Sequence, residues 1–237
     1  MSFYSKFSDY YHYIFPYRPK VFRFLQEQLP FDGPVLDVGC GIGHYAAVFA
    51  EKGHKAIGID RDADMIRIAR QDYPRADFYV MDMLDIVNLK SNFALIFSTG
   101  NVMAHLDMDQ LERFIKQVHS KLLTGGRWVF QVLNFDALLQ RSSYAFPEIT
   151  ADKDRIVFYR YYPRIDRRGT PFQTELQVKG KIVFKEEVTL YPQPSQVYID
   201  AHQAADLRFL EQYADFSKKA YNREEISANI FIFEKAK

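Results

Sequence analysis

Residues 35–43 decide the fold, and they read VLDVGCGIG. A short apolar run is followed by three alternating glycines, which predicts a buried strand, a tight turn and the start of a helix. Glycines in such a turn let the backbone approach a ligand closely, and the helix N-terminus offers unpaired N–H groups to a carboxylate. Asp37 places a negative charge inside the strand, which disfavours a pyrophosphate and favours a cationic ligand.

The first half of the sequence extends this pattern into a parallel sheet. Between residues 34 and 134, apolar runs rich in Val, Ile and Phe alternate with segments of helical periodicity, which is typical of repeated βα units. The expected strands cover residues 35–38, 56–60, 76–81, 93–98 and 127–133. The clearest helix begins at Asp107, which resembles a capping box with Gln110, and the pair Gly125-Gly126 is expected to end it.

Acidic residues end the second and third expected strands. Asp60 stands where an acidic side chain accepts hydrogen bonds from ribose hydroxyls, and Asp82 ends the next strand in the same way. Because ligands of open α/β folds bind at the carboxyl ends of the strands, we expect Asp37, Asp60 and Asp82 to surround one ligand. Taken singly, Asp60 and Asp82 also suit helix N-caps, and Asp37 suits a residue that satisfies loop amides.

Together these residues resemble the class I S-adenosylmethionine-dependent methyltransferases over residues 35–134. Residues 35–43, 58–60 and 81–83 are similar to the first three motifs of that family, and residues 123–132 to the strand that follows its glycine turn. The resemblance implies an α/β fold with a Rossmann-like seven-stranded, mostly parallel sheet, helices on both faces and a reversed hairpin at its end. It also implies S-adenosylmethionine as the cofactor.

The resemblance assigns parts of the cofactor to particular residues. The glycine loop is expected at the methionine part, Asp60 at the ribose, and Asp82 with the backbone of Met83 at the adenine. The expected cofactor-binding residues are Asp37, Gly39, Cys40, Gly41, Gly43, Asp60, Arg61, Asp82, Met83 and Ser98.

Residues 100–106, GNVMAHL, resemble the corresponding segment of the glycine and sarcosine N-methyltransferases. This likeness implies an amine nitrogen as the methyl acceptor. The side-chain carbonyl of Asn101 is expected to orient the N–H bonds of the amine, and His105 to receive a proton after transfer, with a structural role for His105 as the alternative. Tyr11, in the aromatic segment 4–17, is expected to close over the cofactor. Asn101, His105 and Tyr11 are therefore the expected catalytic residues.

The sequence changes character after residue 134. Residues 155–165, 172–178 and 182–190 read as strands separated by glycine turns, which predicts an antiparallel meander. We expect residues 151–195 to be an antiparallel β insertion over the acceptor site, with Arg160 available to an acidic group on the substrate or to solvent. A helix over 199–212 and strands around Phe216 and at 230–233 are expected to follow. Residues 1–30, with a helix over 18–29, are expected to form an N-terminal helical cap on a single domain, 1–237.

Composition limits the class of protein. There are 31 Lys and Arg against 30 Asp and Glu, so no global field attracts a polyanion and a nucleic-acid substrate is disfavoured. The single cysteine, Cys40, cannot form an internal disulfide, and no metal cluster is expected. No signal peptide and no apolar run long enough for a bilayer are visible. We therefore expect a cytoplasmic protein that acts on a small-molecule acceptor, without membrane or nucleic-acid partners.

Several alternatives stay open at this point. An O-methyltransferase, a nucleic-acid methyltransferase on the same fold, and a non-catalytic S-adenosylmethionine-binding protein all remain compatible with the motifs. Nucleic-acid enzymes that methylate exocyclic amines often carry an Asn or Asp before Pro-Pro-aromatic, whereas residues 98–101 read STGN. A nicotinamide-dependent oxidoreductase is disfavoured because His44 stands where the G-x-G-x-x-G pattern needs its last glycine. The identity of the acceptor and the oligomeric state do not follow from the sequence.

Overall fold

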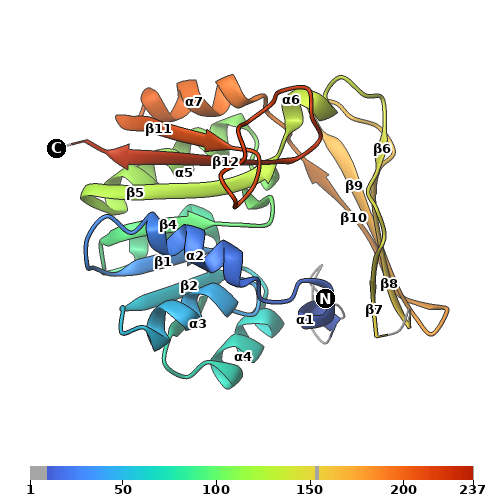
Figure 1. Ribbon diagram of the computed structural model, residues 1–237, viewed down its shortest axis with the longest axis horizontal. Helices are drawn as coiled ribbons and strands as arrows, with labels where there is room; N and C mark the ends of the chain where they lie inside the picture. The colour runs from blue at the N-terminus through green and yellow to red at the C-terminus, as the bar shows by residue number, and fades with distance from the viewer. Residues whose placement is uncertain (1–9, 153–154, 237) are drawn as a thin grey trace.

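The computed structural model describes residues 10–152 and 155–236, which form a main sheet and a smaller sheet that stands across the ends of its strands (Figure 1). The main sheet has seven strands in the order β11-β12-β5-β4-β1-β2-β3. These are β1 (Val35–Val38), β2 (Ala56–Asp60), β3 (Asp77–Val80), β4 (Phe93–Ser98), β5 (Leu122–Leu133), β11 (Leu207–Tyr213) and β12 (Ala228–Lys235). Strand β12 runs antiparallel to both neighbours, and the other neighbouring strands are parallel. The predicted Rossmann-like sheet with a reversed hairpin is confirmed.

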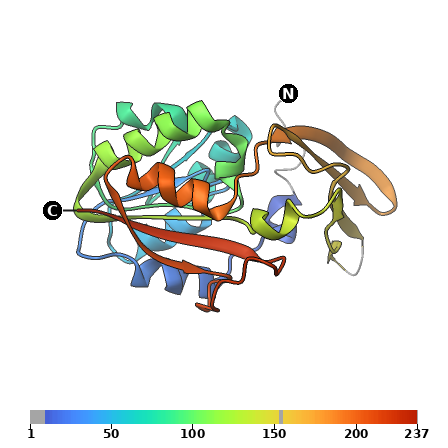
Figure 2. The same cartoon turned by 90° about the horizontal axis from the view of Figure 1, so that it is seen from above.

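The two faces of the main sheet carry different sets of helices. Side chains alternate between the faces along each strand, so that Leu36 and Phe130 pack on one side while Val35 and Val129 pack on the other. The first side is covered by α5 (Met108–Lys121) and α7 (Ser195–Gln203), and the second by α2 (Pro19–Glu27), α3 (His44–Glu51) and α4 (Ala63–Asp72). Figure 2 shows α5 and α7 on one side of the sheet and α2 on the other. Helices therefore cover both faces, as predicted.

Helix α5 begins as the sequence predicts but ends earlier. The Asp107 side chain accepts a hydrogen bond from the backbone N–H of Gln110 at 2.9 Å, and the Gln110 side chain accepts from the backbone N–H of Asp107 at 3.2 Å. The expected end at the glycine pair is wrong, because Leu122 is already extended and pairs with Phe93 of β4. The glycine pair lies inside β5 beside a register shift, where a Cβ at Gly126 would be 2.8 Å from the Leu123 carbonyl oxygen.

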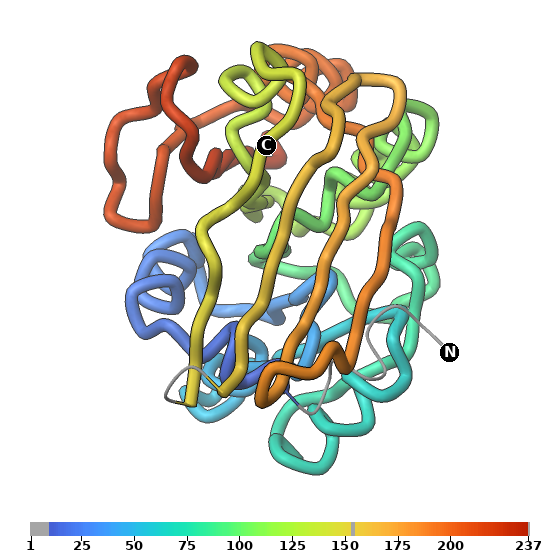
Figure 3. The backbone as a smooth tube through the Cα atoms, turned by 90° about the vertical axis from the view of Figure 1, so that its right-hand side faces the viewer, coloured from blue at the N-terminus to red at the C-terminus, as the bar shows by residue number. Residues whose placement is uncertain are grey.

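The insertion forms a five-stranded antiparallel sheet, larger than the expected meander. Its three long strands, β8 (Ile156–Tyr162), β9 (Thr170–Val178) and β10 (Lys181–Leu190), confirm the predicted meander. Two short strands, β6 (Tyr144–Ala145) and β7 (Ile149–Ala151), also pair with β8, so the sheet starts before residue 151. Figure 3 looks onto this sheet, whose strands run side by side across the end of the main body.

The C-terminal part corrects two expectations. Helix α7 ends at Gln203, and residues 207–213 form strand β11, so the helix predicted over 199–212 is wrong in its second half. The strand predicted around Phe216 is also wrong: Phe216 lies in the connection between β11 and β12 and packs edge-on against Phe24 at 5.4 Å. Strand β12 contains the predicted strand 230–233.

The N-terminal segment connects the two sheets. Helix α2 confirms the helix predicted over 18–29, two residues shorter at its end. The short helix α1 (Tyr11–Ile14) precedes it, and Ile14 packs in one cluster with Ile42 of the glycine loop and Phe158 of the insertion. Residues 1–9 of the expected cap lie outside the described residues.

Candidate functional site

The carboxyl ends of β1, β2, β3 and β4 open into a cavity of about 600 Å³. The main sheet forms its floor, segment α1 closes one side, and the inner face of the insertion sheet forms the opposite wall. Most residues expected at the site from the sequence line this cavity: Tyr11, Asp37, Gly39, Cys40, Gly41, Asp60, Arg61, Asp82, Met83, Asn101 and His105. The chain thus brings together residues from separate strands and from the N-terminal segment.

The glycine loop has a backbone conformation that residues with a side chain rarely adopt. Gly39 and Gly41 have φ angles of 71° and 54°, in the left-handed region that glycine adopts without strain. A Cβ at Gly39 would lie 2.7 Å from a methyl group of Val102, and one at Gly41 would lie 2.9 Å from the hydroxyl of Tyr11. The two glycines therefore let Val102 and Tyr11 close over the loop.

Two carboxylates lie beside this loop, one buried and one half-buried. Asp37 is 2 % exposed, and neither Asp37 nor Asp60 forms an ion pair within the part of the chain that the structure describes. Burial, followed by the nearby Asp60, raises the pKa of Asp37 well above its usual range. Burial also raises the pKa of Asp60, although the N–H groups of Asp62 and Gly41 oppose the increase. A cationic ligand would stabilise both carboxylates.

Asp60 connects the second strand to the glycine loop. One carboxylate oxygen accepts from the Gly41 N–H at 2.9 Å, and the other accepts from the Asp62 N–H at 2.9 Å. Because an ionised carboxylate has about four acceptor positions, each oxygen keeps the capacity to accept a further hydrogen bond from a ligand. The helix N-cap role belongs to Asp62, whose side chain accepts from Asp64 and Met65.

Asp82 is an N-cap in this structure as well as a cavity residue. Its side chain accepts from the Leu84 N–H at 2.8 Å at the start of the 3₁₀ helix η2 (Met83–Asn88). Arg61 is exposed at the same end of the cavity, and Met83 is half-buried. The exposed edge beyond β3 thus offers acceptor oxygens and a thioether to one end of an elongated ligand.

Two expected cofactor residues lie outside the cavity lining, and a third lines it without being reactive. The hydroxyl of Ser98 is buried and donates to the Val38 carbonyl at 2.7 Å, and Ser98 does not line the cavity. Gly43 begins α3 away from the cavity, where a Cβ would lie 2.5 Å from the ring of Phe78. Cys40 lines the cavity, but burial, followed by Asp37 and Asp60, raises the pKa of its thiol well above the usual range. Cys40 therefore stays a protonated small side chain and is no nucleophile.

The segment after β4 forms the middle of the cavity. Asn101 has a φ of 69°, and its side-chain carbonyl accepts from the Leu133 N–H at 3.0 Å, so β5 holds its position. It leads into the 3₁₀ helix η3 (Val102–His105). Burial, followed by the charge of Arg61, lowers the pKa of His105 to about 4. His105 is therefore neutral near pH 7 and is a weak base.

Sequence reasoning missed most of the wall opposite the glycine loop. Phe158, Arg160 and Tyr162 stand two residues apart in β8 and all line the cavity, although only Arg160 was expected there. Phe172 and Thr174 of β9 join them. The predicted strand over residues 155–165 was the available signal, since residues two apart share a face of a strand.

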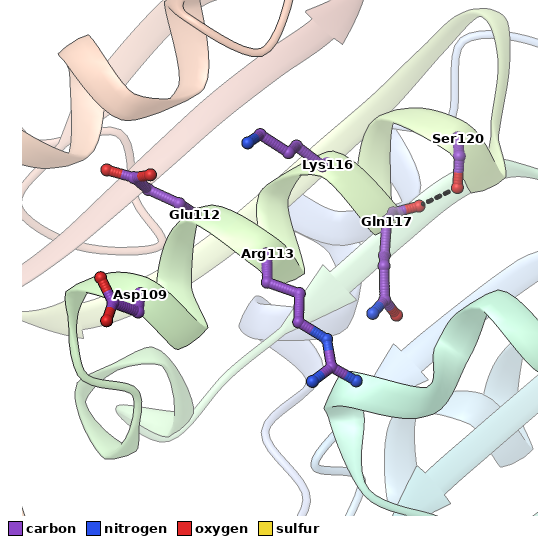
Figure 4. Close-up of a pocket in the computed structure, with 6 residues that line it drawn as sticks. All are labelled: Asp109, Glu112, Arg113, Lys116, Gln117 and Ser120. Atoms are coloured by element: carbon purple, nitrogen blue, oxygen red, sulfur yellow. Dashed lines mark hydrogen bonds between the residues drawn. The ribbon is translucent and has the colours of Figure 1, made fainter.

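Figure 4 shows a second, shallow hollow on the outer surface of α5, lined by Asp109, Glu112, Arg113, Lys116, Gln117 and Ser120. Its side chains of both charge signs follow one exposed helix face, and Gln117 and Arg113 donate to the Leu84 carbonyl. This hollow is an ordinary solvated helix surface. Among residues 10–152 and 155–236, no three His, Cys, Asp or Glu side chains are grouped to hold a metal ion, and no helix is long and apolar enough to cross a bilayer.

Part of the chain is similar in sequence to known methyltransferases. Residues 35–126 match the family described as a methyltransferase domain. A malonyl-[acyl-carrier protein] O-methyltransferase of Hamiltonella defensa is 24% identical over 153 residues, which cover 64% of this chain and 57% of that protein. The chain thus matches little more than half the length of this curated relative.

Solved structures share the whole architecture. An S-adenosylmethionine-dependent methyltransferase from Clostridium acetobutylicum superimposes with a TM-score of 0.82 at 17% identity, over 99% of both chains. The amino pentose methyltransferase CalS10 from Micromonospora echinaspora, solved with S-adenosylmethionine bound, has a TM-score of 0.70 at 17% identity, over 92% of this chain and 89% of that one. At these identities the likeness establishes the fold.

Proposed function

The chain carries a methyltransferase domain of the class I S-adenosylmethionine-dependent family, and from that premise we propose that it transfers a methyl group from S-adenosylmethionine to a small organic acceptor held in the cavity. The observation that carries this proposal is the pair of carboxylates beside the glycine loop, the buried Asp37 and the half-buried Asp60.

The described residues suit this cofactor. The sulfonium and ammonium groups of S-adenosylmethionine are cationic, and a bound cation would favour the ionised forms of Asp37 and Asp60, whose pKa values burial raises. The free acceptor capacity of Asp60 suits ribose hydroxyls, and Asp82 with the backbone of Met83 suits the adenine. The bound cofactor would supply a methyl group already activated by the positive charge on sulfur, so alignment provides much of the acceleration.

We propose an amine nitrogen as the acceptor atom. A neutral amine attacks without losing a proton first, so it needs orientation more than it needs a strong base. His105, with a pKa lowered to about 4, is a weak base that suits such a substrate. The fold shared with an amino pentose methyltransferase supports the same choice. Asn101 and the backbone of residues 98–100 would orient the amine, and Tyr11 would cover the reacting groups.

A small molecule suits the enclosed cavity better than a nucleic acid does. The insertion sheet stands across the end of the main body (Figure 3), and its long strands contribute Phe158, Phe172 and Phe184 to the cavity wall. The near balance of 31 basic and 30 acidic residues provides no field for a polyanion.

Titration calorimetry with S-adenosylhomocysteine and with NAD tests the cofactor. We expect S-adenosylhomocysteine to bind and NAD to show no heat. Incubation with S-adenosylmethionine and a metabolite extract, followed by mass spectrometry for the gain of one methyl group, tests the reaction. Binding without any methylated product would favour a non-catalytic binding protein, and a product methylated on oxygen or carbon would reject the amine assignment.

A further inference from the structure

Three polar side chains gather on the inner face of the insertion sheet. Arg160 and Tyr162 stand two residues apart in β8 and therefore share a face, and Arg160 lies directly opposite Thr174 of β9. All three residues line the cavity, on the wall opposite the glycine loop. The three side chains thus form one polar patch on an otherwise apolar wall.

Arg160 and Thr174 each carry a buried polar atom with no hydrogen-bond partner among the described residues, and the buried Tyr162 hydroxyl has only the neighbouring Asn101 side chain beside it. These atoms are Nε of Arg160, the hydroxyl oxygen of Tyr162 and Oγ1 of Thr174. A buried donor or acceptor without a partner destabilises the fold, and native proteins contain few of them. Such a cluster in residues that line a cavity indicates a bound group that provides the missing partners once the side chains reorient.

The patch is positively charged and has aromatic surroundings. The Arg160 guanidinium lies 5.1 Å from the ring centre of Phe146 and 5.9 Å from that of Phe158, and Nη2 donates to the Pro147 carbonyl at 3.1 Å. Arg160 forms no ion pair within the described part of the chain. The acidic side chains of the cavity belong to the strand ends of the main sheet. Arg160 is the one arginine that the described part of the insertion contributes to the cavity lining, while Arg18 and Arg61 line it from the main body.

We infer that Arg160, Tyr162 and Thr174 form a subsite for a carboxylate group of the methyl acceptor, while the neighbouring phenylalanine rings hold an apolar or aromatic part of the same molecule. This inference rests on the proposed function, because it names the substrate class of the same cavity. A planar carboxylate matches the fork of a guanidinium, and hydroxyls donate to its remaining lone pairs. Since the three atoms are closed to solvent, their engagement needs a change of side-chain rotamer.

A carboxylate suits this patch better than a phosphate dianion. One guanidinium neutralises one negative charge, and a second charge among phenylalanine rings would stay uncompensated. The patch also adjoins the expected acceptor segment, because the Asn101 side chain lies beside the Tyr162 hydroxyl and the Tyr191 N–H donates to the Ala104 carbonyl at 2.7 Å. A carboxylate at Arg160 therefore leaves the rest of the acceptor near Asn101.

Calorimetry with probe compounds tests the subsite on the full-length protein saturated with S-adenosylhomocysteine. The probes are phenylacetate, its uncharged amide phenylacetamide, and phenyl phosphate. We expect phenylacetate to bind at least about tenfold more tightly than the other two, because a charge-assisted hydrogen bond contributes about a tenfold factor or more in affinity. Arg160→Gln should remove the preference for phenylacetate, and Arg160→Lys should restore it in part, since lysine keeps the charge without the planar fork.

Arg164→Gln serves as the matched control, because Arg164 is exposed just beyond β8 and does not line the cavity. The affinity for S-adenosylhomocysteine, measured in every variant, separates the two proposals. If S-adenosylhomocysteine binds but phenylacetate shows no preference over its amide, or if Arg160→Gln keeps that preference, the carboxylate subsite is refuted and the proposed function stands. If S-adenosylhomocysteine itself does not bind, the proposed function fails. Tighter binding of phenyl phosphate would also overturn the inference.

Discussion

Asp60 shows at the scale of one residue how a side chain can hold a loop and still bind a ligand. Its two oxygens fix the N–H groups of Gly41 and Asp62, and both retain acceptor capacity toward the cavity. We expect Asp60→Ala to weaken the binding of S-adenosylhomocysteine by about 1 to 3 kcal/mol, because the ribose hydroxyls lose their acceptor. Calorimetry measures this change, with Asp64→Ala on α4 as the surface control. Equal affinity in Asp60→Ala and the unchanged protein would reject the role.

Asn101 has a left-handed backbone conformation and lines the cavity. Because its φ is 69°, glycine is the replacement that removes the side chain without backbone strain, whereas alanine adds strain. We expect Asn101→Gly to lower turnover of the identified acceptor with little effect on affinity for S-adenosylhomocysteine. Steady-state kinetics and calorimetry test both parts. Full turnover of Asn101→Gly at saturating acceptor would show that Asn101 only supports the loop.

The protonation of His202 makes the free energy of unfolding depend on pH. Its Nε2 accepts from the indole N–H of Trp128 at 3.0 Å, and Nδ1 lies 2.6 Å from the Tyr198 carbonyl. Burial lowers the pKa of His202 to about 3, so protonation is favoured in the unfolded chain. Stability is therefore complete above the unfolded pKa of about 6.5 and falls as the pH drops toward 3.

We expect the free energy of unfolding to decrease by roughly 2 kcal/mol between pH 7.5 and pH 5 because of this histidine. Urea denaturation at several pH values measures the decrease. His202→Phe should be less stable at pH 7.5, since the Trp128 N–H loses its acceptor, but should lose less stability on acidification. An equally steep pH dependence in His202→Phe would assign the effect to other groups.

At the scale of elements, helix α5 depends on its capping box. Asp107 satisfies a free N–H at the start of a helix that packs four buried side chains, Leu111, Phe114, Ile115 and Val118. We expect Asp107→Ala to reduce the free energy of unfolding by about 1 kcal/mol, measured by denaturant titration. Asp109→Ala, in the first turn of the same helix, is the control and should change the free energy of unfolding by about a few tenths of a kcal/mol. Equal effects of the two substitutions would contradict the capping role.

The sequence predicted the bounds of some strands and helices more accurately than those of others. Strands β1, β2 and β4 have the predicted bounds, because each is a buried apolar run whose ends are marked by a loop. Residues 207–212 read as helix because Leu, Glu and Gln are good helix formers. Pairing with β12 overrides that preference, and the chain leaves α7 through Asp206 at a φ of 59°. Strands β6 and β7 are too short for any periodicity to show.

The sequence predicted those residues of the candidate site that belong to local sequence patterns. Asp37 lies within β1, Asp60 ends β2 and Asp82 follows β3 by two residues, so the parallel sheet alone brings them together. Ser98 and Gly43 follow the same pattern in sequence, but their packing partners, Val38 and Phe78, decide their role. The acceptor wall needs contacts between β8 and strands far away in sequence, which no local pattern contains.

At the scale of the molecule, the insertion depends on the main sheet for its inner face. Leu176 is fully buried, and Phe158 and Phe184 are nearly so, in a cluster shared with Ile42 and Met65 of the main body. A small sheet without that support is marginal in water. We expect a fragment of residues 142–192 alone to show no cooperative thermal transition by circular dichroism, while the whole protein does. A cooperative transition in the fragment would identify the insertion as an independent domain.

The hydrogen bond between Trp128 and His202 gives the protein a built-in optical reporter. Trp128 is the single tryptophan of the sequence, is fully buried and does not line the cavity. Its fluorescence therefore reports the integrity of the core on the α5 side of the sheet and is expected to respond little when ligands enter the site. Excited at the indole band, the folded protein should emit at short wavelength, and the red shift on denaturation follows loss of this core without any added label.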